Sequence, residues 1–137
     1  QFVRQDERLF PLVKQFMGLK PPRFPSLFGS VTNAIACQQI SLESGLSLLN
    51  RISQHYGLPF EEGDKIYYSF PEASTIMHCD IENLRVLGFS QRKSEALINL
   101  ALAITSQKDT YSKLEQKSDK DIVEILSNLK GIGRWSI

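Results

Sequence analysis

Apolar residues recur at intervals of three and four along most of this chain, which is the spacing of one face of an α-helix. Five stretches show this spacing most clearly: residues 9–17, 27–40, 42–56, 91–104 and 119–129. Serine is a favoured N-cap residue because its hydroxyl can accept a hydrogen bond from a free backbone N–H of the first turn. The last four stretches each follow a serine: Ser26, Ser41, Ser90 and Ser118. The pattern therefore predicts five helices, four of them capped by serine.

Prolines, glycines and polar residues interrupt the helical pattern. The segment Lys20–Pro25 is rich in proline and predicts an extended connector. Two shorter helices are expected, one beginning at Pro71 and one between Asp80 and Gly88. Residues Glu61–Phe70 are polar and irregular, which predicts a loop. Alternating apolar and polar positions are short and rare, so the sequence predicts an all-α fold, a helical bundle without a sheet.

Composition places the chain among ordinary globular proteins. Its 137 residues suit a single helical domain that covers residues 1–137, and 16 Lys and Arg against 15 Asp and Glu give a formal charge of +1. That balance excludes a polycation that coats nucleic acid, although it does not exclude a local basic face. Two cysteines are too few for a disulfide scaffold or a cysteine zinc site, and they fit a reducing compartment. No apolar run is long enough to span a membrane, and the start at Gln1 leads us to expect a fragment.

One short motif carries chemistry. The predicted helix from Ser118 ends in Gly131-Ile132-Gly133, followed by residues able to start another helix. This arrangement is typical of a helix-hairpin-helix turn. Its glycines accept positive φ and leave no side chain against an approaching phosphate, so that backbone N–H groups can bind an anion. From the glycines alone, a glycine C-cap that joins two packed helices is the alternative interpretation.

Four stretches, taken in order, resemble the helix-hairpin-helix DNA glycosylase superfamily and, within it, the DNA-3-methyladenine glycosylase II (alkylpurine) family. They are AIACQQIS at 34–41, FPEA at 70–73, LGFSQRK at 87–93 and LKGIGRWS at 129–136. The resemblance implies a helical glycosylase fold whose helix-hairpin-helix motif begins at about residue 118 and runs past residue 137. It also implies base excision repair, in which the N-glycosidic bond of an alkylated purine such as 3-methyladenine is hydrolysed after the nucleotide is flipped out of the duplex.

Trp135 stands where superfamily members that also cut the DNA backbone have a lysine that forms a Schiff base with the sugar. An indole cannot act as that nucleophile, but it can stack on a positively charged alkylated base. The resemblance therefore implies a monofunctional glycosylase that uses water as the nucleophile, with Trp135 in the substrate pocket. A buried core indole is the alternative for Trp135.

The resemblance also assigns DNA-binding roles to two turns. Gln39 is expected to enter the duplex where the damaged nucleotide leaves it, and Gln38 to support that loop or contact the opposite strand. Gly88, Ser90 and Lys93 are expected on the same DNA-facing surface, Lys93 as a phosphate or surface cation. The alternatives are glutamines that only cap a helix end, and a solvated helix face for Lys93.

Backbone phosphates are the expected partners of the glycine motif. The resemblance assigns such contacts to four of its residues: Gly131, Gly133, Arg134 and Ser136. The backbone carbonyls of Leu129 and Ile132 are the expected ligands of a monovalent cation that would bridge the hairpin and a phosphate. No organic cofactor is expected.

The family's catalytic carboxylate, an Asp near the sugar, is expected beyond Ile137, so this chain alone is expected to be inactive. Asp119 and Asp121 lie at a helix start, where capping explains them.

Two other function classes remain open for the chain: a non-catalytic module that docks the DNA backbone and an all-α protein-interaction domain. The expected partner is double-stranded DNA that contains alkylated bases. The protein is expected to bind it as a monomer and not to associate with a membrane. Its expected location is the cytoplasm (nucleoid) of a bacterium or the nucleus of a eukaryote.

Overall fold

The computed structural model describes residues 8–20 and 23–133. These residues form mostly helices, with one short hairpin of strands. The elements are α1 (Phe10–Gln15), α2 (Leu27–Cys37), α3 (Leu42–Tyr56), β1 (Pro59–Glu62), β2 (Lys65–Tyr68), α4 (Ala73–Ile76), α5 (Ile81–Val86), α6 (Gln91–Ser106), α7 (Lys108–Ser112), the 3₁₀ helix η2 (Leu114–Gln116) and α8 (Asp119–Ser127). All five predicted helices are present, but α1 spans only Phe10–Gln15, and α2 ends at Cys37, before the predicted end at residue 40. Helices α7 and η2 are additions that the apolar spacing does not predict.

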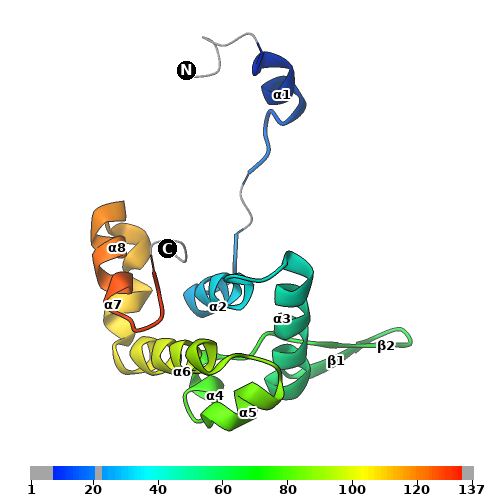
Figure 1. Cartoon of the computed structure of the whole chain (residues 1–137), viewed down its shortest axis with the longest axis vertical. Coiled ribbons are helices and arrows are strands. Elements are labelled where there is room, and N and C mark those ends of the chain that lie inside the picture. Colours follow the sequence, from blue (N-terminus) through cyan, green and yellow to red (C-terminus); the bar gives the residue numbers. More distant parts are fainter. Residues whose placement is uncertain (1–7, 21–22, 134–137) are drawn as a thin grey trace.

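Helix α6 is the centre of the body. It packs against α2 on one side and against α4 and α5 on the other, and α7 continues from its end (Figure 1). Leu97 and Leu100 of α6 are fully buried, together with Ile35 of α2 and Ile52 of α3. Helix α6 therefore forms the centre of the hydrophobic core, and segments that pack on it are joined to that core.

The serine caps predicted from the sequence are present at all four helix starts. The Ser26, Ser41, Ser90 and Ser118 hydroxyls each accept a hydrogen bond from the backbone N–H three residues later, over 3.1, 3.2, 3.4 and 3.3 Å. Each bond satisfies one of the N–H groups that a helix start leaves without an intrahelical acceptor. The caps therefore define where α2, α3, α6 and α8 begin.

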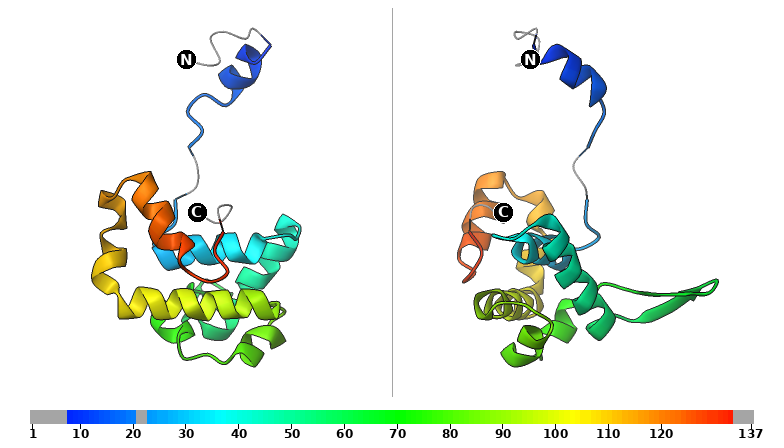
Figure 2. Two further views of the ribbon diagram at one scale, coloured as in Figure 1. Left: turned by 60° about the vertical axis from the view of Figure 1, so that its left-hand side comes forward. Right: turned by 45° about the vertical axis from the view of Figure 1, so that its right-hand side comes forward.

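The predicted all-α class is confirmed, but the expectations of an irregular loop at Glu61–Phe70 and of no sheet at all are wrong. Strand β1 pairs antiparallel with β2, with Phe60 opposite Tyr67, and the two rings stack with centroids 5.6 Å apart. Gly63 opens the two-residue turn with φ +60°. All eight strand residues are exposed, and the hairpin projects from the body (Figure 2). Since neither face is buried, the alternation that identifies a half-buried strand is missing from the sequence.

Helix α1 lies apart from the body (Figure 1). The predicted helix is confirmed in type, but none of its described residues is buried. Its apolar stripe therefore faces solvent in this structure. Among the described helices, none combines the length and the apolar character that a membrane span requires.

Candidate nucleic-acid interface

The turn between α2 and α3 holds Gln38 and Gln39. Gln39 has φ +56°, a left-handed backbone conformation that costs conformational energy for residues other than Gly, Asn or Asp. Its side chain is exposed, and the neighbouring Ile40 is 40% exposed. The turn therefore presents a polar and an apolar side chain outward from a strained backbone.

The turn between α5 and α6 is built on Gly88 and Ser90. Gly88 ends α5 with φ +97°, and its backbone N–H donates to the Arg85 carbonyl over 2.8 Å. A β-carbon built on Gly88 would lie 2.7 Å from a guanidinium nitrogen of Arg51, so this flexible side chain of α3 lies close to the turn and would have to shift if position 88 carried a side chain. Arg51 was not predicted as a site residue, but its exposed cation lies beside a turn predicted to face DNA.

Lys93 lies in the first turn of α6, where its ammonium donates a hydrogen bond to the Ala36 carbonyl at the end of α2 over 2.7 Å. Burial lowers the pKa of Lys93, and the electrostatic influence of Cys37 acts in the opposite direction. The side chain is partly buried, so Lys93 does not lie on a fully solvated face of the helix. The contact with Ala36 was not predicted, because the two residues are 57 positions apart.

The glycine motif after α8 contains two glycines in different surroundings. Gly131 has φ +93°, and a β-carbon built on it would lie 2.5 Å from Cβ of Ala96 in α6. Gly133 has no such neighbour within 4 Å in the described part of the chain. Gly131 is therefore required by the fold itself, whereas nothing described in the chain requires a glycine at position 133.

Other contacts hold the motif against α6. Ile132 is 6% exposed and anchors the turn in the core. The exposed Lys130 forms an ion pair with the partly buried Glu95 of α6, with 3.6 Å between nitrogen and oxygen. The Leu129 carbonyl accepts the Ile132 N–H over 3.1 Å, which leaves its second lone pair for another ligand.

The first two turns of α6 bring these three stretches together. Ser90 caps the helix, Lys93 reaches the end of α2, and Ala96 contacts Gly131. The loop after α8 accordingly passes close to α6 (Figure 2, left). Three of the four motif stretches thus meet at one helix start. Arg134, Trp135 and Ser136 lie outside the described residues.

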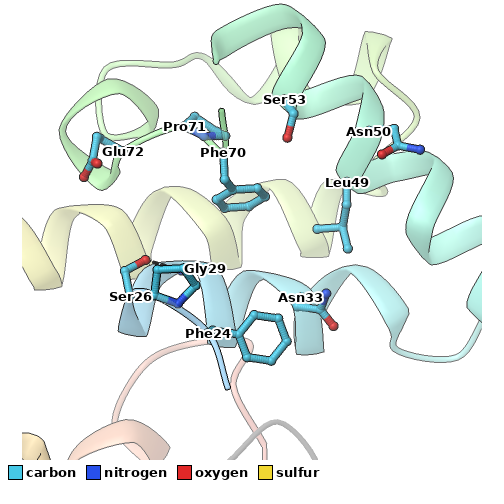
Figure 3. A pocket seen from close by; sticks show the side chains of 11 residues that line it. Phe24, Ser26, Gly29, Asn33, Leu49, Asn50, Ser53, Phe70, Pro71 and Glu72 are labelled. Carbon is cyan, nitrogen blue, oxygen red and sulfur yellow. Dashed lines mark hydrogen bonds between the residues drawn. The ribbon is translucent and has the colours of Figure 1, made fainter. Parts of the chain in front are cut away.

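A hollow of about 500 Å³ lies on another part of the body, between α2, α3 and the segment before α4 (Figure 3). The rings of Phe24 and Phe70 line it together with the amides of Asn33 and Asn50. None of these residues was predicted as a site residue. Phe70 belongs to the FPEA stretch at 70–73, whereas Phe24, Asn33 and Asn50 belong to none of the four motif stretches. Among the described residues, no group of three or more His, Cys, Asp and Glu is arranged to hold a metal ion.

The described residues thus form a helical body whose glycine turn packs on the start of a central helix, with an exposed, strained turn nearby. The model of the HhH-GPD superfamily base excision DNA repair protein family matches residues 32–134. The match covers most of the chain, and the chain belongs to this family.

Relatives with known names support this placement. A DNA-3-methyladenine glycosylase of Bacillus subtilis is 27% identical over 99% of this chain and 45% of its own length. The solved structure of a 3-methyladenine DNA glycosylase from Archaeoglobus fulgidus is 30% identical, with a TM-score of 0.79 over 98% of this chain and 46% of that chain. The 3-methyladenine DNA glycosylase Mag1 of Schizosaccharomyces pombe, solved in complex with abasic DNA, is 28% identical, with a TM-score of 0.75 over 96% of this chain and 61% of that chain. The chain thus spans about half the length of these relatives.

Proposed function

We propose that this chain is the DNA-docking part of a base excision repair glycosylase that hydrolyses the N-glycosidic bond of alkylated purines such as 3-methyladenine. The observation that carries the proposal is the meeting of the Gln38–Gln39 turn, the Gly88–Ser90 turn and the Gly131–Gly133 turn at the start of α6. The names of the relatives support the choice of alkylated bases, and DNA in the Mag1 complex supports a DNA partner.

The backbone at Gly131–Gly133 binds a DNA phosphate in this proposal. Amides at a glycine turn stabilise an anion without reading the base sequence. Arg134 and Ser136 add a cation and a hydroxyl, and the carbonyls of Leu129 and Ile132 hold a monovalent cation between turn and phosphate. The free lone pair of the Leu129 carbonyl fits that ligand role.

The reacting base is unstacked by Gln39 and received by Trp135. Gln39 occupies the space that the flipped nucleotide vacates, and Gln38 supports it or contacts the opposite strand. Trp135 stacks on the alkylated base, whose positive charge favours an aromatic face. Since an indole forms no Schiff base, the enzyme is monofunctional, of the glycosylase II type, and takes its hydroxyl from water. The carboxylate that stabilises the sugar cation is supplied from beyond residue 137.

The partner in this proposal is double-stranded DNA bound by one copy of the protein. The corresponding location is the compartment that holds DNA, the nucleoid in a bacterium or the nucleus in a eukaryote.

Replacing Gly133 by alanine is expected to weaken binding to duplex DNA of any sequence by about tenfold while the melting temperature stays unchanged. The added methyl meets no described atom of the chain, so the fold accepts it, but it stands where a phosphate would approach the backbone. Affinity is measured by fluorescence anisotropy between about 50 and 200 mM salt, roughly a fourfold range of salt concentration. Wild-type affinity in this variant would argue against docking through the turn.

The matched control is Gln54→Ala, an exposed neutral change on α3, for which wild-type affinity is expected. If the unaltered chain shows no salt-dependent binding, the protein-interaction class replaces the DNA-binding class, since phosphate contacts release counterions.

Replacing Trp135 by alanine in the full-length protein is expected to slow excision of 3-methyladenine by about tenfold, because the stacking partner of the cationic base is lost. Affinity for undamaged duplex is expected to change less than threefold, roughly within the scatter of such contacts. Single-turnover excision and anisotropy on the same preparation separate the two quantities. An equal loss in both would place Trp135 in the core or on the phosphate surface.

A further inference from the structure

Helix α2 ends just before the exposed turn, and its last carbonyls need new partners. In a longer helix the Ala36 carbonyl would accept the N–H of residue 40, but α2 stops at Cys37. The Ile35 carbonyl accepts the N–H of Gln38 over 3.3 Å. The last turn of α2 contains no basic residue that could serve the negative end of the helix dipole.

Lys93 supplies this missing group from another helix. Its ammonium lies 2.7 Å from the Ala36 oxygen, and a hydrogen bond to a charged donor is stronger than one between neutral groups. The backbone of Lys93 is fixed in turn, because its N–H donates to the Ser90 cap. A cation on α6 therefore holds the end of α2 in place.

Helix α3 also packs against this end of α2. A β-carbon built on Gly45 would lie 2.5 Å from Sγ and 3.1 Å from Cα of Cys37. The glycine lets α3 approach the last residue of α2 closely. The strained Gln39 follows two residues later and is exposed.

We propose that Lys93 is a positioning residue, which through its bond to the Ala36 carbonyl holds the Gln38–Gln39 turn in the conformation that enters the duplex. This inference rests on the proposed function for the use of the turn on DNA, although the bond itself does not. It differs from the expectation that Lys93 contacts a phosphate, because here its cation serves a carbonyl of its own chain.

The test compares Lys93→Met with Lys93→Arg and with Lys113→Met, an exposed lysine of the described part that keeps the charge change equal. Hydrogen exchange of the Gln38 amide is measured first without DNA. Lys93→Met is expected to accelerate it about tenfold, since a charged hydrogen bond is lost, and Lys93→Arg to restore most of the protection. Lys113→Met is expected to match the unaltered chain.

The second measurement uses a duplex with 2-aminopurine next to a single abasic site. At saturating protein, Lys93→Met is expected to lower the 2-aminopurine fluorescence gain about fivefold while the slope of log affinity against log salt stays unchanged. Loss of a phosphate contact would instead reduce that slope by about 0.9. A reduced slope with unchanged Gln38 exchange overturns the proposal.

The unaltered chain decides two further outcomes. If Lys93→Met does not fold, hydrogen exchange at the ¹⁵N-labelled ammonium of Lys93 is measured in the unaltered chain instead. Exchange at Lys93 as fast as at Lys113 would overturn the proposal. If the unaltered chain does not bind duplex, the proposed function fails, while the Gln38 exchange data still establish or overturn the hold of Lys93 on the turn.

Discussion

Replacing Gly131 by alanine is expected to lower the free energy of unfolding by about 3 kcal/mol, the sum of a backbone and a steric cost. At φ +93° an L side chain is strained, which costs about 1–2 kcal/mol. The new methyl would also lie 2.5 Å from Cβ of Ala96, a buried residue of the central helix that cannot move away freely. Such overpacking costs about 1–3 kcal/mol. Urea unfolding followed by circular dichroism measures the sum.

Two further variants test the cause of this loss. Gly133→Ala lies two residues away without a described neighbour and is expected to change stability by less than about 0.5 kcal/mol. Ala96→Gly removes the opposing methyl, although a glycine within α6 itself costs about 1 kcal/mol. The double variant Ala96→Gly with Gly131→Ala is expected to be more stable than the sum of the two single losses. If the two losses of stability were strictly additive, or if Gly131→Ala unfolded at the same urea concentration as the unaltered chain, the packing of the Gly131–Gly133 turn on α6 would be contradicted.

Replacing Gly45 by alanine is expected to destabilise the chain by about 2 kcal/mol, opposite in sign to the usual effect of this change within a helix. An ordinary glycine-to-alanine change in a helix gains about 1 kcal/mol because alanine has the higher helix propensity. Here the new methyl would lie 2.5 Å from Sγ and 3.1 Å from Cα of Cys37, and the second of these atoms belongs to the backbone. The steric cost therefore exceeds the gain in propensity.

The partner variant Cys37→Ala separates the two contacts. It removes the sulfur and leaves the backbone contact, so Cys37→Ala with Gly45→Ala is expected to recover part of the loss and not all of it. The same displacement moves the end of α2, so Gly45→Ala is expected to reduce the 2-aminopurine response as Lys93→Met does. A stabilised Gly45→Ala chain would show that α2 and α3 are farther apart than described.

Residue type and spacing suffice for the long helices of this fold. The serine hydroxyl at positions 26, 41, 90 and 118 satisfies a backbone N–H within its own turn, and the apolar spacing identifies the face that joins the core. Both are local effects, and a local effect can be predicted from neighbouring residues. The exposed hairpin escapes the same reasoning because it buries neither face, and its pairing depends on a turn glycine and two stacked rings.

The motif stretches of the candidate interface could likewise be identified from their residues and their order. Their roles in the fold could not. Gly131 and Gly133 are equivalent in the sequence, but α6 packs against the first and not against the second. Lys93 has the sequence context of a solvated helix start, but its ammonium is bonded to a carbonyl 57 residues earlier. Such contacts join residues that are distant along the chain, so they form only when α2, α3 and α6 pack around one core. Neighbouring residues in the sequence therefore cannot predict them.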